Sequence, residues 1–265
     1  MLVDSHCHLD FPEFADDLDG VVARAEAAGV GTMVTICTHV TKFAQVQAVA
    51  RRFPNIFCTV GIHPHEAQSE PDTDAATLIT LAGTDKVVGI GETGLDYYYD
   101  NAPRAAQRRA FRAHIAAARA TGLPLIVHSR DADEDTIAIL REEAEEGTFP
   151  GLIHCFTAGP ELARAALDLG LYISLSGIVT FKNAADLRET ARQIPPERLL
   201  VETDAPFLAP VPRRGKTNEP AYVAHTAAYL ADMLDMEAAA FADLTTDNFF
   251  RLFSRAQRPE RIATG

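Results

Sequence analysis

Two histidines, His6 and His8, lie two positions apart at the end of the first apolar run of the chain. In a β-strand, residues i and i+2 point to the same face, so both imidazoles would project together while Cys7 projects the other way as a packing residue. A rigid strand with two nitrogens on one face can bind one metal ion. Paired histidines are also common as hydrogen-bonded core or surface residues, so a metal site requires further ligands at matching positions.

Further imidazoles and carboxylates follow later apolar runs of the chain. They are His63, Glu92, His128, His154 and Asp204. Four imidazoles and two carboxylates, without His63, are too many for one tetrahedral ion. They suit two divalent ions that share a carboxylate and keep positions open for water.

The elements that carry these residues alternate between short β-branched runs and Ala-rich amphipathic stretches, which is typical of strand–helix units around a parallel sheet. The expected strands are Leu2–His8, Thr32–Cys37, Ile56–Gly61, Val87–Gly91, Leu125–His128, Leu152–Cys155, Leu171–Leu175 and Leu199–Glu202. The expected helices include Leu18–Ala28, Thr41–Arg52, Arg104–Thr121, Asp133–Glu145 and Pro160–Leu169, several of them followed by glycine. One or two further helices are expected in Met236–Phe253.

Eight such units in about 250 residues predict an α/β fold, a single (β/α)₈ TIM-type barrel with an extra C-terminal helix. A doubly wound open sheet is the alternative, but no GxGxxG motif follows the first strand. No linker or repeat divides the chain, so residues 1–265 are expected to form one domain. In a barrel the reactive residues lie at the carboxyl ends of the strands, where all the candidates fall; His39, His114 and His225 stand aside.

Composition restricts the class of protein. The chain has 265 residues, 47% of them hydrophobic, and no signal-peptide pattern or apolar run near the roughly 20 residues of a membrane helix, which predicts a cytoplasmic protein. The four cysteines lie in apolar runs without a CxxC pair and are expected to be buried thiols. A net charge of −13 argues against binding nucleic acid by bulk electrostatics, although a metal centre and a few basic groups can hold one phosphate.

Sequence motifs spanning nearly the whole chain resemble the TatD family of metal-dependent hydrolases, within the amidohydrolase superfamily. The matching segments are DSHCHLD (4–10), GIHPHEA (61–67), GIGETGLDYYY (89–99), PLIVHSRDADED (124–135), HCFTAG (154–159), VETDAPFLAP (201–210), RGKTNEP (214–220) and TTDNFFRLF (245–253). The HxH pattern alone is unspecific, but the ordered set is highly specific.

The resemblance implies two ligand sets with Glu92 as the bridge between them. The first set is His6, His8, Glu92 and Asp204, and the second is Glu92, His128 and His154. Glu92 and Asp204 are the expected catalytic residues, with a metal-bridged hydroxide attacking phosphorus in line and Asp204 orienting it or accepting its proton. Mg²⁺ or Mn²⁺ is expected for activity, and Zn²⁺, Co²⁺ or Ni²⁺ also suit these ligands.

The resemblance also places substrate contacts around the metal site. They are His63, His65, Arg130, Arg214 and Lys216. Guanidinium or ammonium groups there would hold phosphate, against the alternative of a solvated basic loop. Asn218 and Glu219 are expected to fix that loop.

Aromatic residues near the expected site have two interpretations. The Tyr97–Tyr99 run and Phe181 could stack nucleobases, but loop or core packing is the commoner use of such residues.

The favoured function is a deoxyribonuclease that acts on single strands or ends, as a monomer without an obligate protein partner or membrane contact. One alternative keeps the two metals but hydrolyses an amide or ester, including an aminoacyl ester. A non-catalytic metal-binding or nucleic-acid-binding module is a third, which would need neither an open metal position nor a bridging carboxylate.

Overall fold

The computed structural model describes residues 1–70 and 73–259, within which eight parallel strands form a barrel. The strands are β1 (Leu2–Cys7), β2 (Val30–Thr35), β3 (Ile56–Val60), β4 (Val87–Asp96), β5 (Leu125–Arg130), β6 (Gly151–Ile153), β7 (Tyr172–Leu175) and β8 (Leu199–Val201). Each strand pairs with the next in sequence. The ring closes just beyond β8, where the His8 N–H donates to the Ala205 carbonyl at 2.8 Å. The predicted (β/α)₈ barrel is confirmed.

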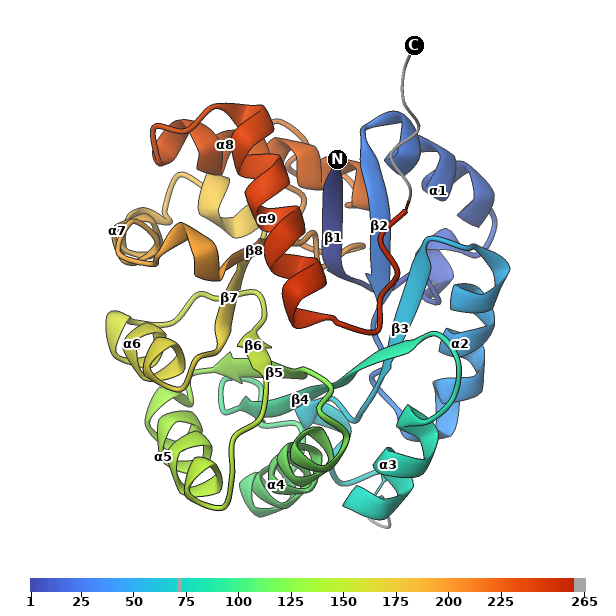
Figure 1. Ribbon diagram of the computed structural model, residues 1–265, viewed down its shortest axis with the longest axis vertical. Coiled ribbons are helices and arrows are strands. Elements are labelled where there is room, and N and C mark those ends of the chain that lie inside the picture. The colour runs from blue at the N-terminus through green and yellow to red at the C-terminus, as the bar shows by residue number, and fades with distance from the viewer. Residues whose placement is uncertain (71–72, 260–265) are drawn as a thin grey trace.

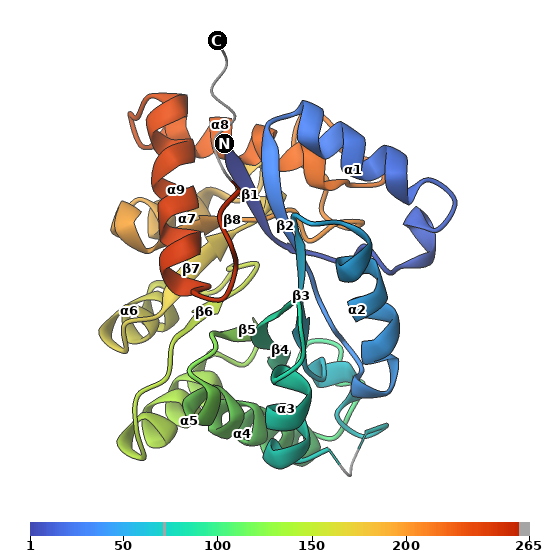
Figure 2. The same cartoon turned by 45° about the vertical axis from the view of Figure 1, so that its right-hand side comes forward.

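Helices surround the ring of strands (Figure 1, and turned in Figure 2). They are α1 (Leu18–Ala27), α2 (Phe43–Arg52), α3 (Ala75–Ala82), α4 (Arg104–Thr121), α5 (Asp133–Glu145), α6 (Pro160–Asp168), α7 (Ala185–Ala191), α8 (Val223–Met233) and α9 (Ala238–Leu252). Helix α9 confirms the expected C-terminal helix. The structure identifies no helix among its described residues that is long and apolar enough to cross a membrane.

The longest helix, α4, illustrates why these stretches are helical. Phe111, Ile115 and Ala118 recur at helical spacing and are fully buried, so one face of α4 packs on the sheet. The helix ends at Gly122, whose φ of 69° lies in the left-handed region that a residue without Cβ adopts most readily. The glycine end signal in the sequence therefore marks the correct residue.

The interior of the barrel is closed at one end by an apolar layer, which we call the barrel floor. Each strand contributes one buried side chain to it, and the end of α9 with the residues after it adds four more: Val3, Val34, Phe57, Val88, Ile126, Leu152, Tyr172 and Leu200 from the strands, and Phe249, Leu252, Phe253 and Ala256 from the C-terminal segment. Phe249 and Phe253 are stacked, with ring centroids 4.5 Å apart. The C-terminal helix is therefore part of the core and excludes water from the barrel interior.

Two strands extend further than the sequence indicated. β4 continues past Gly91 to Asp96 because it pairs with β5 along this stretch, with Gly94 opposite His128 and Asp96 opposite Arg130. The expectation that Glu92 follows the fourth strand and that His128 ends the fifth is therefore wrong. Both side chains lie on paired strands, which fix their backbone more firmly than a loop would.

The cysteines mostly follow the expectation. Cys7, Cys37 and Cys58 are fully buried, and the Cys7 thiol contacts the Val34 carbonyl at 3.3 Å within the core. Cys155 is an exception, because it is only partly buried and lines the cavity described below.

Candidate metal centre

The first predicted ligand set converges where β1 ends, in the middle of β4 and just beyond β8. His6 Nε2 lies 3.4 Å from Glu92 Oε2 and 3.5 Å from Asp204 Oδ1. His8 Nε2 lies 3.3 Å from the same Asp204 oxygen. Both imidazoles of the HxH pair therefore face one carboxylate, as alternation along a strand predicts.

The second predicted set meets the other oxygen of Glu92. His154 Nε2 and His128 Nδ1 lie 2.8 and 2.9 Å from Glu92 Oε1, and 3.4 Å from each other. Glu92 thus presents one oxygen to each set, the arrangement expected of a bridging carboxylate. The structure brings all six predicted metal ligands together.

His63 lies closer to this centre than a substrate contact alone requires. Its Nε2 is 3.5 Å from Glu92 Oε1, and ligand atoms of His63, Glu92 and His128 form a compact group. His65 lies one step further out, with Nε2 at 2.8 Å from Asp96 Oδ2. The geometry therefore allows His63 to act as a ligand as well as a substrate contact.

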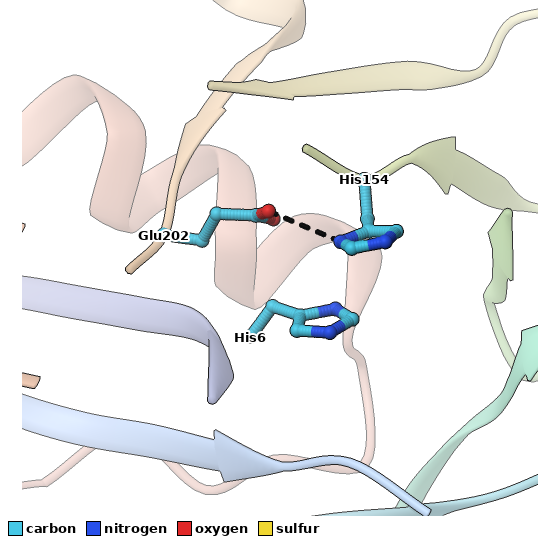
Figure 3. A group of neighbouring side chains, drawn as sticks. All are labelled: His6, His154 and Glu202. Carbon is cyan, nitrogen blue, oxygen red and sulfur yellow. Dashed lines mark hydrogen bonds and ion pairs between the residues drawn. The ribbon is translucent and has the colours of Figure 1, made fainter. Parts of the chain in front are cut away.

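Glu202 is a carboxylate that the sequence interpretation missed. Its side chain is fully buried, accepts the Cys155 N–H at 2.8 Å and faces His154 Nδ1 at 3.1 Å (Figure 3). The His154 ring is stacked on that of His6, with centroids 3.8 Å apart. With Nδ1 directed at Glu202, Nε2 of His154, which lies 2.8 Å from Glu92 Oε1, would be the nitrogen that binds a metal ion, which is how outer carboxylates orient metal-binding histidines. In the sequence, the position of Glu202 two residues before Asp204 could have indicated that it lies near the metal ligands.

Asp96 orients a histidine of the second set, as Glu202 orients His154, and the sequence interpretation missed this carboxylate too. Its Oδ2 lies 3.2 Å from His128 Nε2, so that Nδ1 of His128 faces Glu92. Its Oδ1 accepts the backbone N–H groups of Tyr98 and Tyr99 at 3.1 and 2.9 Å. These hydrogen bonds fix the carboxylate before any ligand binds.

Electrostatics keep the two central carboxylates ionised. Burial acts to raise the pKa of Glu92, but the charges of His154, His63 and His6 outweigh it and hold that pKa well below the usual value. Asp204 behaves alike, because its contact with His8 outweighs burial and lowers its pKa. Ionised carboxylates are what a divalent cation requires of these positions.

The residues present fit divalent cations. Both ring nitrogens of His6 are buried and lack a hydrogen-bond partner among the described residues, and its Nε2 faces two carboxylate oxygens at distances longer than a strong charged hydrogen bond. An unpaired buried nitrogen is costly unless it binds something. Imidazole and carboxylate together form a suitable donor set for a divalent ion.

The cluster opens into a cavity of about 680 Å³. Its lining combines ligand candidates with other polar and aromatic residues: His8, Phe11, Thr38, His39, His63, His65, Glu66, Glu92, Asp96, Tyr99, His128, Ser129, Arg130, His154, Cys155, Thr157, Ile178, Asp204, Phe207 and Leu208. A cavity of this size admits a nucleotide-sized group to the cluster.

The remaining sequence candidates divide into two groups. Arg130 lines the cavity, whereas Arg214 and Lys216 are exposed and lie outside the described lining, with the Arg214 guanidinium 3.8 Å from the Phe181 ring centroid. His39 lies at the cavity wall, where Nε2 faces Glu66 at 3.0 Å, so the expectation that it stands aside is wrong. That position follows β2 at the same rim.

Fold and site together define a class: a parallel (β/α)₈ barrel with imidazoles and carboxylates gathered at the carboxyl ends of its strands is a barrel metallohydrolase. The profile of the family described as "TatD related DNase" matches residues 3–254. The chain belongs to this family.

Relatives match over nearly the full chain. "Uncharacterized metal-dependent hydrolase YcfH" of Escherichia coli (strain K12) is 46% identical over 255 residues, 95% of both chains. "3'-5' ssDNA/RNA exonuclease TatD" of Escherichia fergusonii is 36% identical over 258 residues, 95% of this chain and 98% of its own. The crystal structure of YjjV, a TatD homologue from Escherichia coli K12, superposes with a TM-score of 0.88 at 29% identity, covering 96% of this chain and 98% of its own.

Proposed function

We propose that this protein is a divalent-metal-dependent deoxyribonuclease that hydrolyses phosphodiester bonds. The observation that carries the proposal is the position of Glu92, whose two oxygens face two separate groups of imidazoles within the cavity. Family membership and the relative named as a single-strand DNA and RNA exonuclease support nucleic acid as the substrate.

Two ions are proposed, with Mg²⁺ or Mn²⁺ for activity and Zn²⁺, Co²⁺ or Ni²⁺ as other candidates. His6, His8, Glu92 and Asp204 would hold one ion. Glu92, His128 and His154 would hold the other, with His63 beside it. When bound, paired divalent ions make a water nucleophilic at neutral pH and neutralise charge on phosphate oxygens.

The protein's own groups supply orientation and proton transfer. Asp204 is ionised at the cavity wall and is the proposed proton acceptor for the attacking water. Arg130 is the proposed guanidinium contact for a substrate phosphate, and His65, held by Asp96, is a second polar contact. Arg214 and Lys216 are proposed as outer contacts to the more distant phosphates of a strand.

Hydrolysis of an amide or ester, including an aminoacyl ester, would use the same metal cluster. The two functions predict different products. A deoxyribonuclease releases nucleotides from DNA, whereas an amide or ester hydrolase turns over small esters and leaves DNA intact. The relatives favour the first. Monomeric state and cytoplasmic location stay predictions.

The deciding experiment is an activity profile of metal-defined protein against single-stranded DNA, double-stranded DNA, RNA and a small ester panel. We expect Mg²⁺- or Mn²⁺-dependent release of nucleotides from single-stranded DNA that EDTA and His128→Ala abolish. Ester turnover with intact DNA would favour the alternative hydrolase. Metal binding without turnover of any substrate would favour a binding module.

A further inference from the structure

Phe207 presents an exposed aromatic ring at the wall of the metal cavity. It follows β8 by six residues, lines the cavity and is 47% exposed. Its ring centroid lies 6.3 Å from that of His8 and 6.0 Å from that of Phe11, with interplanar angles of 64° and 79°. Both contacts are edge-to-face, so they do not cover Phe207 by parallel stacking.

The backbone that carries Phe207 is held in place. Its N–H donates to the Asp204 carbonyl at 2.9 Å, and its own carbonyl accepts from Asn218 Nδ2 at 2.6 Å. Asn218 is fully buried and also donates to the Thr203 carbonyl at 2.9 Å. The segment that places Asp204 in the metal cluster therefore also fixes Phe207, and a ligand that covers the ring need not order this backbone.

The tyrosines across the cavity differ in what covers them. Tyr98 and Tyr99 are 58% and 53% exposed, but the Arg130 guanidinium carbon lies 4.2 and 4.7 Å from their ring centroids. Within the described chain, Phe207 has no such cation over its ring. Its face is the one more available to a planar ligand.

Apart from the proposed cations, the side chains of the cavity offer little positive charge to a nucleic acid. Arg130 is the single Lys or Arg in the described lining, against four carboxylates from Glu66, Glu92, Asp96 and Asp204, and the whole chain carries −13. Proteins usually gain most of their affinity for nucleic acid from basic contacts to phosphates. Stacking of a base on an aromatic ring requires no positive charge.

We infer that Phe207, backed by Phe11, is a stacking site for one nucleobase of a single-stranded nucleic acid, on the side of the metal centre formed by His8 and Asp204. The inference rests on the proposed function and specifies its substrate. Within a duplex both faces of each base are covered by neighbouring bases, so a stacking site favours single strands and frayed ends.

The test measures cleavage of two single-stranded DNA oligonucleotides in the presence of Mn²⁺ and compares Phe207→Ala with wild type. One carries bases throughout, and the other carries abasic tetrahydrofuran residues on both sides of the cleaved bond. We expect Phe207→Ala to lower kcat/KM about 10- to 100-fold on the first and by less than about twofold on the second. Phe207→Trp should keep or increase activity on the first. Val211→Ala, which changes another exposed apolar residue of the same loop, should match wild type on both.

An equal loss of kcat/KM on both oligonucleotides would show that Phe207 acts by positioning Asp204. This result would overturn the stacking inference but not the proposed function. No loss on either would also overturn it. Wild-type protein that cleaves neither oligonucleotide would overturn the proposed function itself. The shift in melting temperature on addition of Mn²⁺ confirms that each variant is folded and binds metal, and Phe207→Trp provides a second measurement if the alanine variant is unstable.

Discussion

The same eight strands build two opposite environments, the barrel floor and the metal cavity. Val3, in the floor, and His6, in the metal cluster, are three residues apart on β1, and both are almost completely buried. The floor is filled by aliphatic and aromatic side chains against α9. The cavity instead buries imidazoles and carboxylates, and both ring nitrogens of His6 and Nδ1 of His8 lack hydrogen-bond partners among the described residues.

The difference separates stability from function. Apolar side chains in the floor gain free energy when they leave water. Polar groups in the cavity lose their hydration, and contacts with each other or with a bound cation offset the free-energy cost of that loss. Substitutions in the floor should therefore change the free energy of unfolding, and substitutions in the cavity should change catalysis.

The largest effect is expected for Glu92→Gln. A neutral amide cannot bridge two cations, so kcat/KM should fall roughly a thousandfold or more, and the increase in melting temperature on adding Mn²⁺ should shrink. Glu66→Gln is the matched control, since Glu66 also lines the cavity but faces His39. Full activity and metal content in Glu92→Gln would contradict the bridging role.

Phe249→Ala should lower the stability of the protein and leave its activity nearly unchanged. Phe249 is fully buried in the floor, and a cavity in its place should cost about 3–5 kcal/mol of unfolding free energy, or about 10 °C in melting temperature. Activity measured well below that temperature should stay near wild type. Phe250→Ala, on the same helix but only partly buried, should cost less. A loss of activity in the folded Phe249→Ala variant would show that the two regions are coupled.

The same contrast explains how far the sequence predicts the structure. Alternating runs and helix-ending glycines predict the barrel because they reflect local backbone preference and burial. Strand order then places His6, His128 and Asp204 at one rim, since carboxyl ends of parallel strands meet there.

Partnerships across the barrel are harder to predict. Glu202 contacts His154, 48 positions away, and only the folded chain shows that it orients this ring. The extension of β4 through Glu92 depends on pairing with β5, and the residue pattern along a single strand does not reveal such pairing. Phe207 is an ordinary apolar residue in sequence, and only the folded chain shows that its ring lies at the cavity wall and that its carbonyl accepts a hydrogen bond from Asn218.

A third prediction contrasts His114 with the histidines of the metal cavity. It is fully buried in α4, where Nε2 accepts the Ile62 N–H at 3.0 Å and Nδ1 donates to the Ala110 carbonyl at 2.7 Å, so the ring is neutral. Burial lowers its pKa from 6.5 to about 4. Protonation therefore favours the unfolded chain, and the stability that neutral His114 provides is complete above about pH 6.5 and lost as pH falls toward 4.

The loss should reach about 3 kcal/mol in that window. Urea unfolding in EDTA at pH 7 and pH 4.5 measures it, with His114→Gln as the comparison. The variant should be less stable than wild type at pH 7 but lose less stability on acidification. Equal losses in both proteins would place the titrating groups elsewhere.

The smallest effect is expected for Asn218→Ala, which loosens the cavity wall without touching the metal cluster. Its amide is the donor to the Thr203 and Phe207 carbonyls, and removing it leaves both without that partner, at a cost of about 1–3 kcal/mol. Because Asp204 and Phe207 belong to the same segment, kcat/KM on single-stranded DNA should also fall about tenfold, as a misplaced group at a reacting centre predicts. Destabilisation by urea with unchanged kcat/KM would show that Asn218 acts as the floor residues do, on stability alone.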